Sequence, residues 1–316
     1  MSFQSCNTAN RACSLIYSYI KTYSHGKWLL PVNCCPDIPL TFCLAGVEFE
    51  FVDIDPNTLC IEEVSCLERL NNFSQEYAGL FFVRTYGYLY NTLKFFTECK
   101  SVCPNLKVLD DRCLCLPERN PEFYNSDMIL YSTGHCKQID LGGGGLAYYS
   151  SVETYVKDSN LIYDGTDEET LYKNAYKENT LLNEIPQGWL KLDDYNDYKS
   201  YIEVIESKKK FRISQREKLN AIYHNNLPKN IQLPLAYNEW RFNIQVPLHL
   251  KDAILHELFA NNLFASNHYH SVNRLFNTDS YPYSDYIYAS VLNLFNDINY
   301  TEEQAFKTTE VINKIL

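Results

Sequence analysis

The sequence predicts an α/β protein with a large domain built on a mostly parallel β-sheet and a small α+β domain at its C-terminal end. Short apolar runs recur between residues 28 and 149 and alternate with stretches of helical periodicity, which is typical of a parallel sheet covered on both faces. After residue 212 the pattern changes to helix, strand and two more helices. A chain of 316 residues is long enough for two domains, and we place the boundary between residues 205 and 206.

The first predicted element is a helix, because apolar residues recur at helical spacing from Ala12 to Ile20. Asn10 precedes this helix, and we expect it to be the N-cap. The helix therefore presents its N-terminus to any ligand at that end of the sheet.

Six apolar runs that follow are predicted strands, with two predicted helices among them. The strands are expected at residues 28–30, 47–54, 79–86, 106–109, 128–132 and 146–149, and the helices at 59–70 and 88–99.

The C-terminal half is less regular. Residues 151–210 are polar and allow only a general prediction of helices and loops. An amphipathic helix is predicted for 212–227, a strand for 240–246, and helices for 251–262 and 302–316. These elements form the predicted small domain.

Composition excludes several classes of protein. A formal net charge of −11 disfavours nucleic acid as a partner. The sequence has no apolar stretch of 18 residues and no signal-peptide pattern, so we expect no membrane span and a cytoplasmic location. The twelve cysteines are scattered through predicted elements, and we expect buried, reduced thiols and no metal site.

Polar residues follow the predicted strands where a ligand is expected. Ligands of open parallel sheets bind outside the carboxyl ends of the strands. Asp110 and Asp111 end one strand, Ser132 ends another, and Lys137 lies in the loop that follows. Residues 142–145 then hold four of the eleven glycines. Such a run allows positive φ angles and close backbone approach, and it fits a ligand loop or a flexible turn equally well.

These residues resemble a known family. Residues 132–145 read STGHCKQIDLGGGG, which is similar to the lysine segment of the DegT/DnrJ/EryC1/StrS-type aminotransferases, Ser-Phe-His-x-x-Lys followed by Gly-Glu-Gly-Gly. Segments 10–12, 30–36, 45–55 and 86–87 resemble the family in order and spacing, as do 240–246, 268–269 and the terminal helix.

The resemblance implies the type I fold of the transferases that depend on pyridoxal 5′-phosphate (PLP), with the cofactor bound covalently to Lys137. A lysine amine in that place can also move a proton between substrate carbons. Asp111 would keep the pyridine nitrogen protonated, so that the ring draws electrons from the substrate. Asp110 is the alternative for this role, unless it is a solvated acid at the strand end.

The resemblance also implies the other contacts of the site. Asn10 and Arg11, at the start of the first helix, and Ser132 would hold the cofactor phosphate. Cys35 stands where family members often carry the aromatic residue that covers the cofactor ring. His268 and Tyr86 are expected to contact the substrate.

The function implied by the resemblance is transamination from glutamate to a nucleotide-linked keto-sugar for surface polysaccharide, O-antigen or capsule, by a homodimer with its active site at the interface. Two departures from the family pattern leave alternatives open: Leu114 replaces the usual His or Gln, and Gly143 replaces the usual Glu. One alternative is other PLP chemistry such as sugar dehydration, for which His135 would replace the lysine. The other is an inactive relative that binds a nucleotide sugar or a partner protein.

Overall fold

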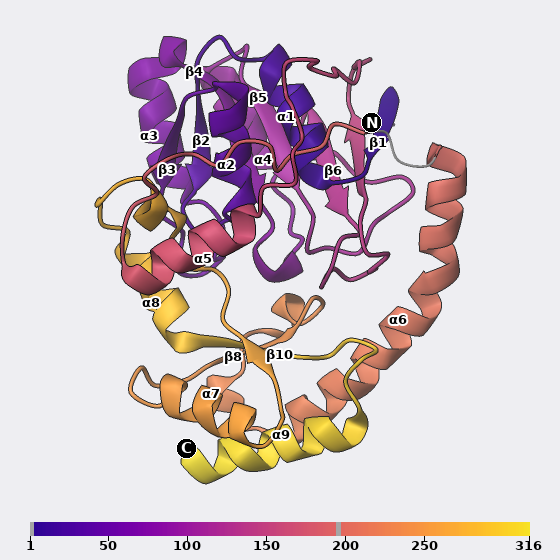
Figure 1. Ribbon diagram of the computed structural model, residues 1–316, viewed down its shortest axis with the longest axis vertical. Helices are drawn as coiled ribbons and strands as arrows, with labels where there is room; N and C mark the ends of the chain where they lie inside the picture. The colour runs from indigo at the N-terminus through magenta and orange to yellow at the C-terminus, as the bar shows by residue number, and fades with distance from the viewer. Residues whose placement is uncertain (1–2, 194–196) are drawn as a thin grey trace.

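The computed structural model describes residues 3–193 and 197–316 and consists of a larger and a smaller part, which one long helix connects (Figure 1). The larger part is coloured indigo to magenta and the smaller part orange to yellow. A mostly parallel sheet lies in the first and a small antiparallel sheet in the second. The predicted fold class is confirmed.

Within the described residues, the large sheet has seven strands in the order β1-β7-β6-β5-β4-β2-β3. All neighbouring strands from β3 to β6 are parallel, whereas β7 is antiparallel to both β6 and β1. The strands are β1 (Ser5–Ala9), β2 (Lys27–Pro31), β3 (Phe49–Val52), β4 (Tyr77–Val83), β5 (Lys107–Asp111), β6 (Met128–Ser132) and β7 (Gly145–Tyr149). The carboxyl ends of β2 to β6 therefore share one edge.

All six predicted strands of this sheet are present, and β1 is an addition that the sequence did not predict. Strand β1 is short, and of its five residues only Ala9 is fully buried. It carries no apolar run, so periodicity does not reveal it.

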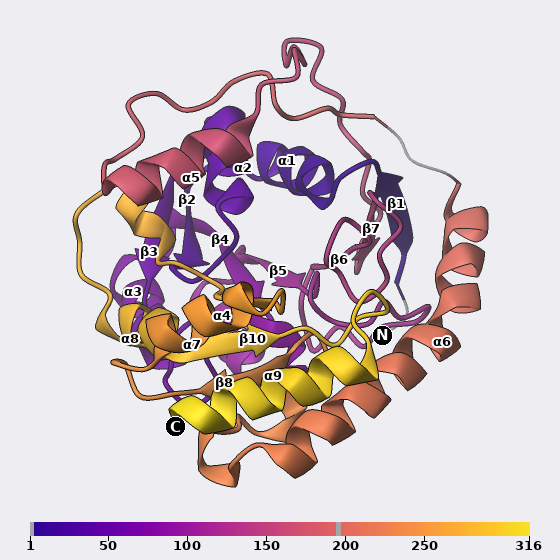
Figure 2. The ribbon, with the colours of Figure 1, turned by 60° about the horizontal axis from the view of Figure 1, so that its bottom comes forward.

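Helices cover both faces of the sheet (Figure 2). Side chains alternate between the faces of a strand: Trp28 and Leu30 of β2 pack in the core with the first pair of helices, and Leu29 packs in the core with the second pair. The first pair is α1 (Ala12–Thr22) and α2 (Asp37–Ala45), and the second is α3 (Glu63–Phe73) and α4 (Leu93–Val102).

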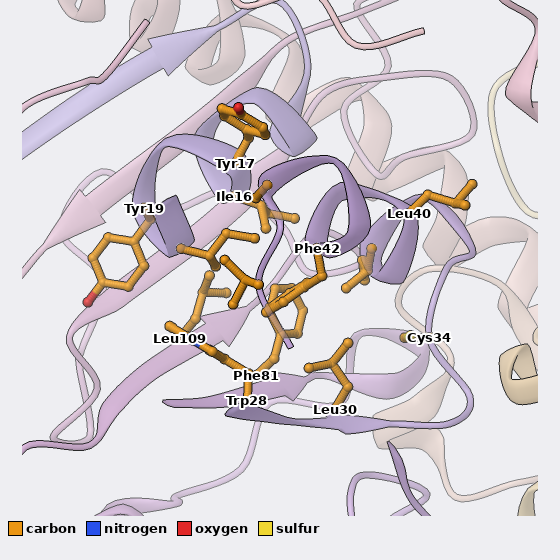
Figure 3. Packing of buried hydrophobic residues seen from close by; sticks show 14 of the residues in the cluster. Ile16, Tyr17, Tyr19, Trp28, Leu30, Cys34, Leu40, Phe42, Phe81 and Leu109 are labelled. Carbon is orange, nitrogen blue, oxygen red and sulfur yellow. The ribbon is translucent and has the colours of Figure 1, made fainter. Parts of the chain in front are cut away.

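Aromatic contacts fix α1 and α2 against the sheet, as Figure 3 shows. The ring of Phe42 in α2 lies edge-on to Trp28 of β2 at 5.7 Å and to Phe81 of β4 at 6.1 Å between centroids. Ile16 of α1 is buried in the same cluster. Large buried aromatic side chains contribute much of the stability of such a core, so the start of α1 has a fixed place at the edge of the sheet.

A long segment, residues 150–193, crosses the outer side of α1 and contains α5 (Glu168–Glu178). The backbone N–H of Val156 donates to Ser18 at 2.7 Å, and the Ser14 hydroxyl donates to the Lys191 carbonyl at 2.8 Å. These bonds join the segment to α1 at two points far apart in the sequence.

Helix α6 (Tyr198–Asn226) runs from the larger to the smaller part without a break. Near its start, Ile202 and Ile205 pack with β6 and β7, and near its end, Leu219 and Ile222 pack in the core of the smaller part. The proposed domain boundary between residues 205 and 206 falls inside this helix.

The smaller part is an antiparallel sheet in the order β8-β10-β9 with three helices. The predicted strand at 240–246 and the helices at 251–262 and 302–316 are confirmed. The elements are β8 (Phe242–Gln245), α7 (Lys251–Ala260), β9 (Ala265–Ser266), α8 (Pro282–Ser290), β10 (Val291–Leu294) and α9 (Glu302–Ile315). None of the helices in the described ranges combines the length and apolarity of a membrane span.

Candidate active site

A cavity of about 440 Å³ opens at the carboxyl edge of the large sheet. It is lined by residues from the ends of β5 and β6, from the loop that follows β6, and from the first turns of α1 and α2. All six residues predicted to bind the cofactor line it, namely Asn10, Arg11, Cys35, Asp111, Ser132 and Lys137. The topology therefore brings together residues that are up to 127 positions apart in the chain.

Asp111 is a buried acidic group that lines the cavity. Its side chain is 5% exposed, and one carboxylate oxygen accepts a hydrogen bond from the backbone N–H of Cys113 at 2.8 Å. Burial raises the pKa of Asp111, while the bond from Cys113 and the positive charge of Lys137 oppose this rise. A cationic group in the cavity therefore favours the ionised form of this acid.

Asp110, the alternative to Asp111, has a structural role instead. Because the two residues are consecutive in β5, their side chains extend to opposite faces of the sheet. Asp110 is fully buried and accepts hydrogen bonds from Arg84 at 2.7 and 2.9 Å and from Arg112 at 2.8 and 2.9 Å. The prediction of a solvated acid at this position was wrong, and Asp110 does not line the cavity.

Lys137 lies in the loop between β6 and β7 and is partly buried in the cavity. Burial lowers its pKa, but the nearby acidic groups of Cys113, Cys35 and Asp111 outweigh that effect, so the pKa of Lys137 lies above its ordinary value. The amine is therefore protonated at pH 7, and its positive charge acts on Asp111.

The glycine run after Lys137 has both a packing role and a place in the cavity. Gly142 and Gly144 have φ angles of +79° and +107°, which favour glycine. A Cβ on Gly144 would collide with the hydroxyls of Tyr201 and Thr133, and one on Gly145 would lie 2.7 Å from the Ala12 Cα. The run thus lets the loop and β7 pack directly against α6 and the start of α1, while residues 142–144 line the cavity.

The N-terminus of α1 also faces the cavity, but Asn10 is not its N-cap. The N-cap is Arg11, which makes no side-chain capping bond. Asn10 is held by backbone bonds instead: its N–H donates to Asp193 at 3.2 Å and its carbonyl accepts from Gly144 at 2.7 Å. The first N–H groups of any helix lack intrahelical acceptors. In α1 the residues that carry such groups include Ala12 and Cys13, and both line the cavity.

Arg11 is engaged by two acids. Its Nη2 lies 2.8 Å from Glu168 of α5 and 3.4 Å from Asp37 at the start of α2, and its guanidinium packs over the Trp189 ring at 5.1 Å. Burial raises the pKa of Asp37 to about 6 despite the charge of Arg11. Arg11 therefore connects α1 to the two helices beside the cavity.

The two residues predicted to contact substrate lie near each other but do not line the cavity. The Tyr86 hydroxyl donates to the His268 carbonyl at 2.5 Å, and both rings pack against Trp240. Burial lowers the pKa of His268 to about 4, so this imidazole is neutral at pH 7. The next residue, Tyr269, is the one that lines the cavity from the smaller part.

Leu114, which departs from the family pattern, lines the cavity. Further lining residues that were not among the predicted site residues are Cys13, Asp37, Cys113, Glu169 and Tyr269. Cys113 lies two positions after Asp111 and Tyr269 directly follows His268, so proximity in sequence was an available signal. For Asp37 and Glu169 no such signal existed. In the described residues, no group of three or more potential ligands could hold a metal ion, and all twelve cysteines are free thiols.

No protein-family model and no curated protein matches this sequence. Solved structures match it over nearly its whole length. PseC of Helicobacter pylori, an aminotransferase involved in the biosynthesis of pseudoaminic acid, has a TM-score of 0.73 at 18% identity, over 99% of this chain and 87% of its own.

Two other structures agree. A DegT/DnrJ/EryC1/StrS aminotransferase of Brucella abortus has a TM-score of 0.69 at 15% identity, over 99% of this chain and 86% of its own. A Streptococcus pneumoniae protein named as a sugar aminotransferase was solved in its PLP form. It has a TM-score of 0.75 at 13% identity, over 99% of this chain and 88% of its own. The chain therefore has the type I fold of PLP-dependent aminotransferases, as the sequence resemblance implied.

Proposed function

We propose that this protein is a PLP-dependent aminotransferase that moves an amino group from glutamate to a nucleotide-linked keto-sugar, in the synthesis of surface polysaccharide. The observation that carries the proposal is the presence of Lys137 and the buried Asp111 in one cavity at the carboxyl edge of the sheet. The similarity in fold to sugar aminotransferases supports the acceptor class.

The residues of the cavity fit this cofactor. A volume of about 440 Å³ lies in the range of small-molecule sites. The start of α1 offers N–H groups and the positive end of the helix dipole to a phosphate, and the hydroxyl of Ser132 borders the same space. Asp111 offers a buried carboxylate to a protonated ring nitrogen, and Cys35 lies in the wall.

When bound, PLP supplies an electron-poor ring that stabilises negative charge on the substrate carbon. Asp111 keeps the proton on the ring nitrogen, because a buried carboxylate binds a cation more strongly than one in water does. Lys137 binds the cofactor, and its released amine takes and returns a proton at the substrate. Tyr269 lines the cavity from the smaller part.

The geometry supports Lys137 over His135 as the reactive group. His135 also borders the cavity, but its side chain is 83% exposed and lies 3.9 Å from Asp140, whereas Lys137 is partly buried and its charge acts on Asp111. Transamination is therefore favoured over sugar dehydration, in which His135 would take the place of the lysine.

The proposal includes a cytoplasmic homodimer, which the sequence resemblance supports. Light scattering at working concentration tests this point by itself. A mass of one chain would contradict the dimer without bearing on the chemistry of Lys137.

The direct test is the visible absorption spectrum of the protein with PLP, before and after addition of glutamate. Wild-type protein is expected to show a visible band that glutamate bleaches. Lys137→Ala should not form the normal band. Transfer of nitrogen to a panel of keto-sugar nucleotides then tests the acceptor. Absence of any band in the wild type would refute the proposal and favour an inactive relative.

A further inference from the structure

A buried arginine outside the cavity has two donor atoms without an acceptor among the described residues. It is Arg216, in α6, which is 6% exposed, and the atoms are its Nε and Nη1. No acidic group of the described chain lies within ion-pair distance of it. Buried guanidinium groups are normally paired, because the loss of water around a charge is strongly unfavourable.

The cations around Arg216 outnumber the acids. Arg241 lies beside it, and Asp297 is the acid whose charge acts on both arginines. Asp297 is already engaged: one carboxylate oxygen lies 2.6 Å from Nη1 of Arg241, and the other accepts from the N–H of Asn299 at 2.9 Å. Arg212, one turn before Arg216, adds a third guanidinium. The site therefore carries excess positive charge in a chain whose net charge is −11.

Arg216 remains charged in this environment. Burial lowers its pKa to about 10, and the charges of Arg241 and Arg212 act in the same direction, whereas Asp297 opposes them. A pKa of about 10 still leaves the guanidinium protonated at pH 7. Within the described residues, the acid that acts on this positive charge, Asp297, forms its ion pair with Arg241.

The arginines lie beside the loop that carries Lys137. Arg212 donates from Nη2 to the Asp140 carbonyl at 3.3 Å, and Trp240, which precedes Arg241, donates from its indole to the Cys136 carbonyl at 2.7 Å. Arg216 itself is not among the residues that line the Lys137 cavity. The unpaired charge therefore lies where α6, the start of β8 and the turn after β10 meet, next to the candidate active site but separate from it.

We propose that Arg216, with Arg212 and Arg241 beside it, binds an oxyanion of the phosphate class, either free phosphate or the diphosphate of a nucleotide. The forked donors of a guanidinium match the oxygens of a phosphate group, which accepts two parallel hydrogen bonds. This ligand supplies both the missing acceptors and the missing negative charge. The inference does not depend on bound PLP or on transamination.

The test is thermal unfolding of the protein without added PLP, as a function of inorganic phosphate at constant ionic strength. A ligand that binds only the folded state raises Tm. At a hundredfold excess over Kd we expect a rise of about 4 °C for the wild type. Arg216→Met has similar length and no charge, and its Tm should rise with phosphate by about 4 °C less than that of the wild type.

Two controls make the comparison specific. Phosphate can also enter the Lys137 cavity, so the measured quantity is the difference between wild type and Arg216→Met. Arg69→Met removes an arginine that is already paired with Glu50 at 2.6 Å, and it should keep the full phosphate response. Arg216→Lys retains the charge and should retain part of the phosphate response. This variant shows whether a lost response in Arg216→Met results from misfolding.

A second series of thermal unfolding measurements, with pyrophosphate and uridine diphosphate in place of phosphate, identifies the ligand. The quantity compared is again the part of the response that Arg216→Met loses. If this part appears with the nucleotide at concentrations at least tenfold below those of phosphate, the ligand is a nucleotide diphosphate, and any smaller difference identifies free phosphate. The same Tm rise in wild type and Arg216→Met, or no rise in the wild type, would overturn the proposal.

Discussion

The Asp110 carboxylate lies 2.7 Å from Nε of Arg84, and both side chains are fully buried. Arg112 reaches the same carboxylate at 2.8 Å. The next residue, Asp111, turns to the other face of the sheet and into the cavity. Two adjacent acids at the end of β5 thus have different tasks: Asp110 binds two buried arginines, and Asp111 lines the candidate ligand site.

Exchange of each acid for alanine should separate these tasks. Asp110→Ala leaves Arg84 buried without an acidic partner and leaves Arg112 only Glu118, at 3.5 Å, and it should lower the free energy of unfolding by about 3–5 kcal/mol. Asp111→Ala removes an acid whose ionised form burial disfavours. It should change stability by less than about 1 kcal/mol but abolish the glutamate-dependent bleaching of the PLP band. Urea unfolding and the spectrum measure the two effects, and equal losses of stability would contradict this division.

The glycine run allows a second matched comparison. Gly144→Ala adds a Cβ at a φ of +107° that collides with Tyr201 and Thr133, and it should destabilise the protein by about 1–3 kcal/mol. A Cβ on Gly143 would lie 3.4 Å from the Asn10 carbonyl, so Gly143→Ala should stay within about 0.5 kcal/mol of wild type. Chemical unfolding checks both. Similar values for the two variants would mean that the loop adopts another conformation in solution.

The sequence predicted most of the large sheet because its strands are continuous apolar runs separated by helical stretches. It did not predict α6 as one helix. The buried positions of α6 change from Ile202 and Ile205, which face the sheet, to Leu219 and Ile222, which face the smaller part. A helix that buries two different faces along its length shows no single periodic stripe, so only its second half was recognisable.

The candidate site was predictable where its residues follow strands directly. Asp111, Ser132 and Lys137 come at or just after the ends of β5 and β6, and parallel strands place such residues together. Asp37 and Glu168 come from the starts of α2 and α5, and their approach to Arg11 depends on how those helices pack. No local pattern encodes that contact.

The contact between Arg11 and Glu168 should control the mobility of α5. Arg11→Gln and Glu168→Gln each remove the 2.8 Å ion pair between α1 and α5, so both should increase amide hydrogen exchange in residues 168–178. Only Arg11→Gln should also weaken PLP binding, because Arg11 lines the cavity at the start of α1. Exchange mass spectrometry and PLP titration measure these effects. Unchanged PLP affinity in Arg11→Gln would show that this arginine is purely structural.

His268 should make the stability of the protein depend on pH in the acid range. Burial lowers its pKa in the folded state to about 4, from an ordinary value of 6.5. Between these two values the unfolded chain binds more protons than the folded one, so stability rises as the pH increases from 4 to 6.5 and then levels off. The contribution of His268 to this rise is at most about 3 kcal/mol.

His268→Asn removes the titrating ring, and the difference between its curve and that of the wild type isolates this contribution. The variant should unfold with a flatter dependence on pH below 6.5, measured by urea unfolding at several pH values. Some slope will remain, because burial also lowers the pKa of His270. Parallel curves for wild type and variant would show that His268 is accessible to protons in the folded state, and would place its ring in contact with solvent instead of in the apolar packing around Trp240.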